Sequence, residues 1–210
     1  MSAGADSLHA VLEGAREAGF LGPGPVEVHR RHAEGFAAAA EAALGRAPAM
    51  FADLGTGGGV PGLVLALRWT GARGIFVDSN HRRTVALRLA VARVGVEDRI
   101  EVLEERAEIV GRPPAHRERY EVVTARSFAG SAVTAEVAAG LVTVRGILVV
   151  SEPPDPSGER WPTAGLADLG FGPAEPVEHA GAHFVVVRKA APAPERFPRG
   201  VGRPAKRPLW

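Results

Sequence analysis

The sequence predicts an α/β protein: a doubly wound, mostly parallel sheet of seven strands, with short helices ahead of it. Two observations lead to this fold class. Short apolar runs rich in Val and Ile alternate with longer runs of helical periodicity, a pattern typical of parallel sheets that helices cover on both faces. A glycine-rich stretch follows the first apolar run, at the point where such folds bind nucleotide-like ligands.

The chain opens with a helical region, residues 1–48. Apolar residues at helical spacing predict helices over 8–18 and 26–44, which the Gly-Pro-Gly-Pro break at 22–25 separates. Gly45 is a typical stop signal for the second of these helices. We therefore expect two helices before the first strand.

Beyond this region the predicted strands and helices alternate. Each predicted strand is a short apolar run, and each predicted helix ends near a glycine or a polar break. The predicted strands cover residues 50–53, 74–78, 100–103, 120–126, 146–150 and 183–188, with a weaker seventh near Val177. The predicted helices between them cover residues 61–67, 83–94 and 132–141, and a loop rich in Pro and Gly is expected over 152–162.

We expect residues 1–189 to form one domain and residues 190–210 to form a basic, proline-rich tail. Five prolines in the tail argue against regular secondary structure there. A tail lying on the surface is one interpretation, and an arm whose positive charge contacts RNA phosphates is the other. The basic residues of this tail are Arg196, Arg199, Arg203, Lys206 and Arg207.

Length and composition limit the classes of function. The 210 residues suit one α/β domain with a full core. Because the chain has no cysteine, disulfides, thiolate metal sites and a cysteine nucleophile are excluded. No run reaches the ~18 consecutive apolar residues of a membrane span, and nothing near the N-terminus resembles a signal peptide. We expect a cytoplasmic protein without a membrane partner.

The glycine-rich stretch satisfies two cofactor templates. A Gly-x-Gly-x-x-Gly pattern ending at Gly62 fits the dinucleotide fingerprint, with Asp78 at the distance of the acid that binds a ribose. An Asp-x-Gly-x-Gly-x-Gly pattern starting at Asp53 fits the loop of S-adenosylmethionine-dependent methyltransferases, in which an acid at the end of the second strand also binds the ribose. Asp78 therefore does not discriminate between the two templates.

Three features favour the methyltransferase template. Asp53 ends the first strand, where an acid suits a cationic sulfonium and ammonium but not a pyrophosphate. The loop follows a long helical region, whereas nicotinamide-binding folds usually open with the loop strand. Little chain follows the sheet to form a separate substrate domain. We expect S-adenosylmethionine as the cofactor, and a tight turn without a ligand is the structural alternative.

The loop sequence Asp53-Leu-Gly-Thr-Gly-Gly-Gly-Val-Pro-Gly62 resembles that of the RsmG family, also called glucose-inhibited division protein B. Further segments resemble the family in the same order along residues 26–210. They are Val77-Asp-Ser79 with Arg82-Arg83, Glu105-Arg-Ala-Glu108, Tyr120-Glu-Val-Val-Thr-Ala-Arg126-Ser-Phe-Ala129, and the run from Arg196 to Leu209. The combination is specific, although no single segment is.

Members of this family are class I methyltransferases of Rossmann-like fold that methylate N7 of a guanine in small-subunit ribosomal RNA. The resemblance implies ribosomal RNA or the small ribosomal subunit as the partner, and we expect a monomer. It places Asp78 on the ribose, Ala107 and Glu108 on the adenine side, and Arg126 at the mouth of the active site as a catalytic and cofactor-binding residue. The expected contacts of the loop are Asp53, Gly55, Gly57, Gly59 and Val60.

The sequence departs from the family on the substrate side. Ser151-Glu152 stands where the family usually has Lys-Gly, and Ala182 rather than Arg precedes His183. Two alternatives therefore stay open: a divergent methyltransferase acting on another RNA or a small molecule, and a non-catalytic paralogue that binds the cofactor. We expect no metal site, because the pair at His29 and His32 has no third ligand nearby.

Overall fold

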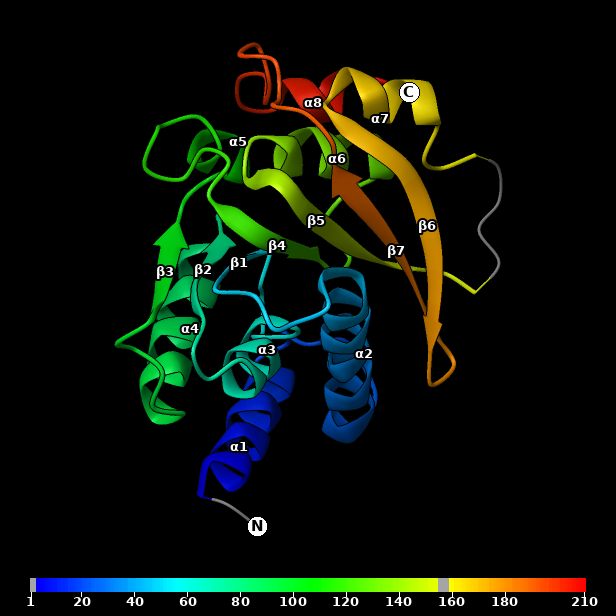
Figure 1. Cartoon of the computed structure of the whole chain (residues 1–210). Helices are drawn as coiled ribbons and strands as arrows, with labels where there is room; N and C mark the ends of the chain where they lie inside the picture. Colours follow the sequence, from blue (N-terminus) through cyan, green and yellow to red (C-terminus); the bar gives the residue numbers. More distant parts are fainter. Residues whose placement is uncertain (1–2, 155–158) are drawn as a thin grey trace.

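The computed structural model describes residues 3–154 and 159–210, and backbone alone for residues 3–6 (Figure 1). The strands are β1 (Met50–Leu54), β2 (Arg73–Asp78), β3 (Ile100–Glu104), β4 (Tyr120–Ala125), β5 (Val142–Glu152), β6 (Phe171–His179) and β7 (Ala182–Lys189). The helices are α1 (Ala3–Glu17), α2 (Val26–Leu44), α3 (Gly62–Arg68), α4 (His81–Arg93), α5 (Ala107–Val110), α6 (Ser131–Ala139), α7 (Thr163–Asp168) and α8 (Arg203–Lys206).

All strands of the described residues join one seven-stranded sheet in the order β3-β2-β1-β4-β5-β7-β6. The pairs from β3 through β5 are parallel, and β7 runs antiparallel to both β5 and β6. The predicted mostly parallel, doubly wound sheet is therefore confirmed. After β3 the chain crosses to the other side of β1, so β1 and β4 meet at the topological switch point, where open α/β sheets bind their ligands.

Helices cover both faces of this sheet (Figure 1). On one face α1 to α4 enclose a core cluster with Phe36, Phe51, Trp69 and Phe184 among its buried side chains. On the other face α5 to α7 and the C-terminal segment enclose a second cluster. Because β1, β2 and β4 are buried on both faces along most of their length, their sequences are mostly apolar rather than alternating, whereas the outer strands β3 and β6 carry exposed charged residues.

Local signals explain where the helices begin and end. The N-terminal helices were predicted on both sides of the 22–25 break, and α2 has the predicted bounds. It ends at Gly45, whose φ of 73° is left-handed and whose N–H donates to the Glu41 carbonyl. α4 begins earlier than predicted because the Asn80 side chain accepts from the Arg83 N–H at 3.1 Å and caps the helix.

The C-terminal segment departs from the prediction. Regular secondary structure was not expected there, yet residues 203–206 form α8; Pro204 fits because a helix's first turn leaves its N–H groups unpaired. Ala193 and Phe197 are buried in the second core cluster. The Trp210 indole N–H donates to the Arg160 carbonyl at 2.9 Å. The segment is thus packed against the domain. Of the expected loop over 152–162, residues 155–158 lie outside the described residues.

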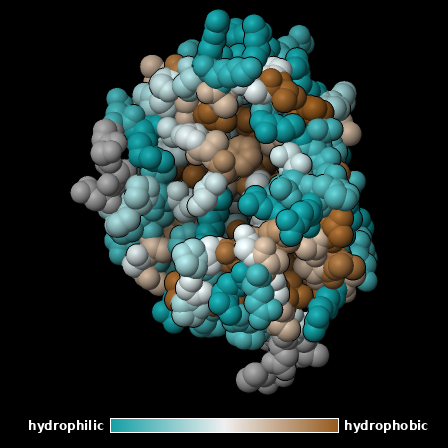
Figure 2. Space-filling model, turned by 180° about the vertical axis from the view of Figure 1, so that it is seen from behind, coloured by the Kyte–Doolittle hydropathy of each residue, from teal (hydrophilic) through white to brown (hydrophobic). Residues whose placement is uncertain are grey.

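Hydrophilic side chains cover most of the face in Figure 2, and apolar ones gather in a hollow in its upper half and along one lower flank. Exposed apolar residues on the helices include Leu89 and Val85 of α4 and Val28 of α2. No helix among the described residues has the length and apolar character to cross a membrane.

Candidate active site

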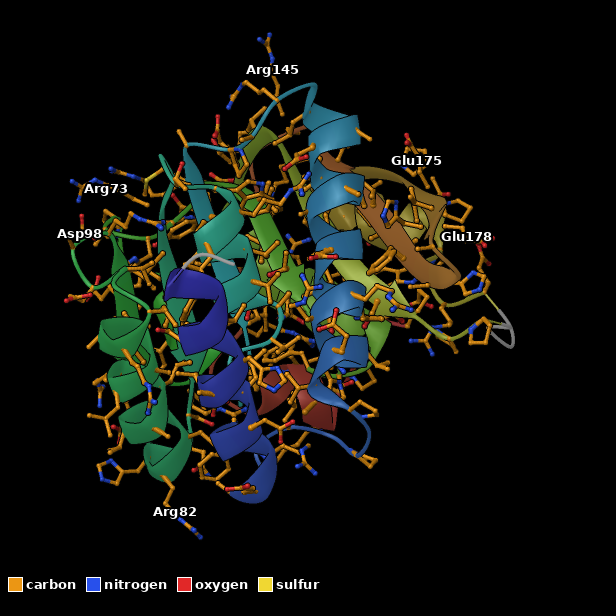
Figure 3. All side chains as sticks on the ribbon, turned by 90° about the horizontal axis from the view of Figure 1, so that it is seen from below. Arg73, Arg82, Asp98, Arg145, Glu175 and Glu178 are labelled. Carbon is orange, nitrogen blue, oxygen red and sulfur yellow. The ribbon has the colours of Figure 1, made fainter. Side chains whose placement is uncertain are left out.

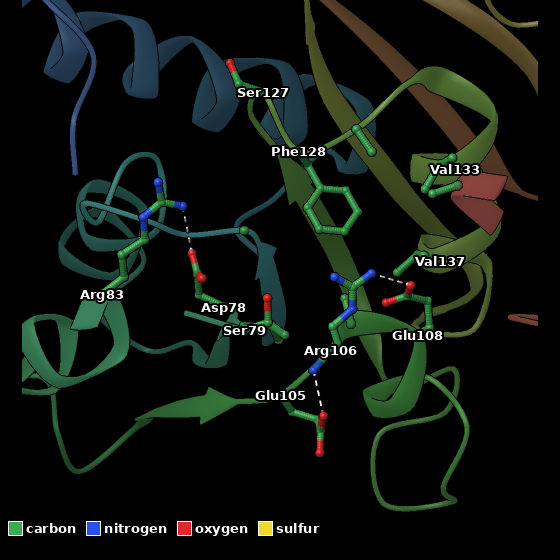
Figure 4. A pocket seen from close by; sticks show the side chains of 15 residues that line it. Asp78, Ser79, Arg83, Glu105, Arg106, Glu108, Ser127, Phe128, Val133 and Val137 are labelled. Atoms are coloured by element: carbon green, nitrogen blue, oxygen red, sulfur yellow. Dashed lines mark hydrogen bonds and ion pairs between the residues drawn. The ribbon is translucent and has the colours of Figure 1, made fainter. Parts of the chain in front are cut away.

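A cavity of about 320 Å³ opens at the carboxyl ends of β1 to β4 (Figure 4). Its lining comes from the end of β2, from the loops that follow β1 to β4 and from helices α4, α5, α6 and α8, which bring together residues that are far apart in the sequence. The lining residues are Gly55, Val77, Asp78, Ser79, Arg83, Glu105, Arg106, Ala107, Glu108, Ser127, Phe128, Ala129, Val133, Val137 and Ala205.

The Asp78 carboxylate is fixed at the edge of this cavity. Oδ2 accepts from the Gly57 N–H at 3.0 Å, and Oδ1 accepts from the Asn80 N–H at 2.9 Å. The Arg83 guanidinium lies 3.9 Å from Oδ2 (Figure 4). Each carboxylate oxygen keeps a free lone pair, so Asp78 can accept hydrogen bonds from a ligand's hydroxyl groups without losing its orientation.

Glycine is required at the start of the loop for two reasons. Gly55 has a φ of +65°, and a Cβ there would lie 2.8 Å from Cδ2 of Phe128. The Phe128 ring therefore covers the loop directly (Figure 4). It follows Ser127, whose φ of +51° is unusual for a residue with a side chain and gives the turn after β4 its shape.

Asp53 lies beneath the loop and not among the lining residues. Its buried carboxylate accepts from the Thr124 hydroxyl at 2.7 Å and from the Gly62 N–H at 3.1 Å. Burial raises the pKa of Asp53 to about 7, although these hydrogen bonds oppose the shift. Asp53 therefore ties β1 to β4 and to the start of α3, which holds the loop in place.

The other predicted loop residues have different surroundings. Gly57 lines a neighbouring apolar groove between α1 and α4 and donates to Asp78. A Cβ on Gly59 would lie 2.5 Å from Leu63, so glycine there serves close packing within the loop. Val60 is buried in the first core cluster. Of the four loop residues after Asp53 in the prediction, Gly55 alone lines the described cavity.

One end of the cavity is a slot with apolar walls. Phe128, Val133 and Val137 line it together with Ala107, and Glu108 lies beside them (Figure 4). Oε1 of Glu108 accepts from Arg106 Nη2 at 2.7 Å and from the Gly202 N–H at 3.2 Å. Burial raises the pKa of Glu108, but these hydrogen bonds outweigh it and lower the pKa below its usual value. A flat heteroaromatic group fits such walls.

Arg126 follows β4 as predicted, but its guanidinium lies against α2 and not in the described cavity lining. Nη2 donates to Nδ1 of His29 at 2.7 Å, and Nε2 of His29 lies 3.0 Å from the Gly22 carbonyl. His29 thus carries its proton on Nε2. Nη1 of Arg126 is buried and has no hydrogen-bond partner in the described part of the chain. Burial lowers the pKa of Arg126, and the charge of Asp53 opposes this.

The predicted RNA-binding residues of the C-terminal segment fall into two groups. Arg199 is paired with Glu136 on α6, with Nη2 2.6 Å from Oε2. The side chains of the other four are exposed: Arg196, Arg203, Lys206 and Arg207. Among the described residues no three His, Asp or Glu side chains gather as metal ligands.

The sheet order, the acid-first glycine loop and the acid at the end of β2 define the class I methyltransferase fold. Solved structures share this fold. The O-methyltransferase from Bacillus cereus in complex with SAH has a TM-score of 0.61 at 15% identity, over 87% of this chain and 90% of that chain. An O-methyltransferase family protein from Burkholderia thailandensis has a TM-score of 0.56 at 16% identity, over 74% of this chain and 55% of that chain.

Sequence comparison narrows the class to one family. The family model of rRNA small subunit methyltransferase G matches residues 25–152. The protein of this name from Chloroflexus aggregans (strain MD-66 / DSM 9485) is 38% identical over 169 residues, which are 78% of this chain and 71% of the relative. The protein of this name from Roseiflexus sp. (strain RS-1) is 38% identical over 172 residues, which are 79% of this chain and 73% of the relative. The chain belongs to the rRNA small subunit methyltransferase G family, which confirms the resemblance seen in its motifs.

Proposed function

We propose that the protein is an S-adenosylmethionine-dependent methyltransferase that methylates N7 of a guanine in small-subunit ribosomal RNA. The observation that carries this proposal is the cavity in which the fixed carboxylate of Asp78 borders an apolar slot. An acid beside a flat apolar slot suits an adenosine group, and the names of the relatives supply the RNA target.

The residues of the cavity fit the proposed cofactor. Asp78 would accept from the ribose hydroxyls, and Phe128, Val133 and Val137 would enclose the adenine beside Ala107 and Glu108. The glycine loop, which Asp53 holds in place, would lie along the amino-acid end of S-adenosylmethionine. Its residues are Gly55, Gly57, Gly59 and Val60. When bound, the cofactor supplies an electrophilic methyl group on a sulfonium.

The proposed acceptor explains why no acid–base pair is needed. Guanine N7 presents a lone pair and carries no proton, so the protein has no proton to remove. Its residues need only align the acceptor and exclude water. Arg126 lies against α2, outside the described cavity lining, and its buried Nη1 has no partner among the described residues; as the proposed catalytic and cofactor-binding residue it would pair through this nitrogen with a carboxylate or phosphate of a bound ligand.

The exposed arginines and lysine of the C-terminal segment would contact RNA phosphates. The chain would act on ribosomal RNA or the small subunit as a monomer in the cytoplasm.

One observation favours a second candidate, a methyltransferase acting on another RNA. At the end of β5, where the family usually has Lys-Gly, this chain has Ser151-Glu152; Ser151 carries no charge, and Oε2 of Glu152 is paired with Nε of Arg160 at 2.7 Å.

Calorimetry with S-adenosylmethionine tests the cofactor site. Asp78→Asn keeps the size of the side chain and removes its charge, and we expect at least about tenfold weaker binding because hydrogen bonds to a charged group are lost. Asp98→Asn is the matched control, because Asp98 projects outward before β3, at the other end of the sheet (Figure 3). Equal binding by wild type and Asp78→Asn would contradict the assignment.

Transfer of a labelled methyl group tests the acceptor. The purified protein is incubated with small ribosomal subunits, with free small-subunit RNA and with an unrelated RNA. We expect label at guanine N7 of the small-subunit RNA. Label only in the unrelated RNA would favour the second candidate. Tight cofactor binding without transfer to any RNA would show a non-catalytic paralogue.

A further inference from the structure

The C-terminal segment supplies one wall of the cavity. Ala205 on α8 lines the same cavity as Asp78 and Phe128. Near α8, the Gly202 N–H donates to Oε1 of Glu108 at 3.2 Å, so the segment also contacts the slot through its backbone. The residues that complete the adenosine end of the site therefore come from two parts of the chain that are far apart in the sequence.

A buried ion pair holds this wall in place. The Glu136 carboxylate on α6 is fully buried, and three groups of Arg199 donate to it: the backbone N at 2.8 Å, Nε at 2.9 and 3.1 Å to the two oxygens, and Nη2 at 2.6 Å. Nη2 of Arg199 also donates to the Arg207 carbonyl at 2.8 Å, which spans α8. Arg199 is thus bonded on both sides, to α6 and to the end of α8.

The same helix carries the apolar wall of the slot. Val133 and Val137 lie three residues before and one residue after Glu136, which places them one helical turn apart on neighbouring positions of α6. The ion pair between Arg199 and Glu136, called the clamp below, therefore fixes two walls of the cavity relative to each other: the valines of α6 and Ala205 of α8. The Arg199 side chain is only 23% exposed, and its Nε and Nη2 donors are engaged by Glu136 and the Arg207 carbonyl, so these two nitrogens are not available to a phosphate.

We propose that the C-terminal segment forms part of the cofactor site through Ala205 and the backbone of Gly202, and that Arg199 is a positioning residue for the adenosine end of that site. This inference rests on the proposed function, since it assigns the cavity to S-adenosylmethionine. Arg199 acts through Glu136 and α8 and touches no cofactor atom. The five basic residues of the segment then have separate roles: Arg199 serves the cofactor, and its exposed neighbours serve RNA.

The first test measures cofactor binding by calorimetry without RNA. We expect Arg199→Ala to weaken S-adenosylmethionine and 5′-methylthioadenosine by about 10- to 100-fold, because a charged hydrogen-bonded pair is broken. Arg199→Lys keeps the charge and should restore part of the affinity. Arg203→Ala is the matched control, because its side chain is exposed on the same segment; we expect unchanged cofactor affinity and weaker RNA binding.

Loss of the buried partner of Glu136 can also unfold the protein, so a second variant leaves the clamp intact. Ala205→Phe adds a ring at an exposed position on the cavity lining, and Val201→Phe adds the same ring at an exposed position of the segment outside the lining. We expect Ala205→Phe to abolish methylthioadenosine binding and Val201→Phe to preserve it, with equal melting temperatures for both variants.

Three outcomes decide the inference. Wild-type affinity for methylthioadenosine in Ala205→Phe, or in folded Arg199→Ala, would overturn it. Lower RNA affinity with unchanged cofactor affinity in Arg199→Ala would return Arg199 to the RNA-binding group and would overturn it as well. If the wild type binds no S-adenosylmethionine, the proposed function fails first, and this result is distinguishable because it needs no variant.

Discussion

Arg126 donates a hydrogen bond of 2.7 Å from Nη2 to Nδ1 of His29 and so connects the end of β4 to α2. His29 is fixed in turn by the Gly22 carbonyl, 3.0 Å from its Nε2. We predict that His29→Leu lowers methyl transfer by about 10- to 100-fold, because a small displacement of a positioned group costs rates of that order. Single-turnover transfer at saturating cofactor measures it.

Val28→Ala is the control for this variant, since Val28 is the preceding residue of α2 and is 56% exposed. It should transfer methyl groups at the wild-type rate. If His29→Leu also transfers at that rate and is folded, the contact with His29 has no part in the placement of Arg126.

Asp53 predicts a pH dependence of stability. Because its pKa is about 7 in the folded protein and 3.8 in the reference state, the folded state binds this proton more tightly. Stability is therefore lost as pH rises from about 4 to about 7, by up to ~1.4 kcal/mol per pH unit. Asp53→Asn removes this contribution. We expect the difference in unfolding free energy between variant and wild type, measured by urea unfolding, to shift in favour of the variant by about 2–3 kcal/mol from pH 5 to pH 7.

Both proteins in this comparison contain the other titrating groups, so the difference reports on Asp53. A constant difference in unfolding free energy across this pH range would show that the carboxyl is already ionised at pH 5.

For His32 we predict a change of stability with pH that is opposite in sign to that of Asp53. Burial, together with the nearby charge of Arg126, lowers the pKa of His32 from 6.5 to about 4. The unfolded chain then binds more protons between these values, so stability is lost as pH falls from about 6.5 towards 4. His32 packs 5.5 Å from Phe36 and 5.3 Å from Phe184, ring to ring, and His32→Phe keeps an aromatic ring there.

We therefore expect His32→Phe to lose less stability than wild type between pH 7 and pH 5, as measured by urea unfolding at both values. The test compares the change in unfolding free energy from pH 7 to pH 5 and not its absolute value, because the larger ring adds a packing cost that is the same at both pH values. Identical slopes would contradict a depressed pKa for His32.

Two glycine substitutions in helices should change stability in opposite directions. On α2, a Cβ at Gly35 would lie 2.5 Å from Cζ of Phe184, whose ring is buried against Phe36. Gly35→Ala should cost about 1–3 kcal/mol through overpacking. On α1, Gly14 has nothing within 4 Å of the added Cβ, and Gly14→Ala should stabilise by about 0.5–1 kcal/mol.

Thermal unfolding of the two variants measures this difference. Equal melting temperatures for Gly35→Ala and wild type would mean that α2 shifts away from β7 without cost.

The sequence was most informative where periodicity and stop signals agree. Of the seven strands in the described residues, the apolar runs placed six, while β6 was expected only as a weaker strand near Val177. The break at 22–25 and Gly45 placed α2, because these signals are local. The short helices α5, α7 and α8 were missed, since a helix of four to six residues has too few turns to show a period. Prolines suggested an irregular tail, although a proline in a helix's first turn costs no hydrogen bond.

The candidate site was only partly accessible from the sequence. Gly55, Asp78, Ala107 and Glu108 were expected together and line one cavity. Asp53, Val60 and Arg126 were expected there too, but a strand's end does not fix which way its side chains point, and these three point into the core or towards α2. The roles of Phe128 and Ala205 depend on contacts between distant segments, for which local patterns carry no signal.

The wall that α8 adds to the cavity has a consequence for the order of assembly. Gly202 and Glu108 are 94 residues apart, and Arg199 and Glu136 are 63 apart, so these contacts close long loops. Loop-closure entropy makes such contacts costly until the intervening chain is folded. We expect a refolding chain to pair the loop at Gly55 with Asp78 first and to dock α8, with Ala205, against the cavity last. Pulse-labelled hydrogen exchange measures this order: amide groups of the loop should become protected before those of residues 199–206.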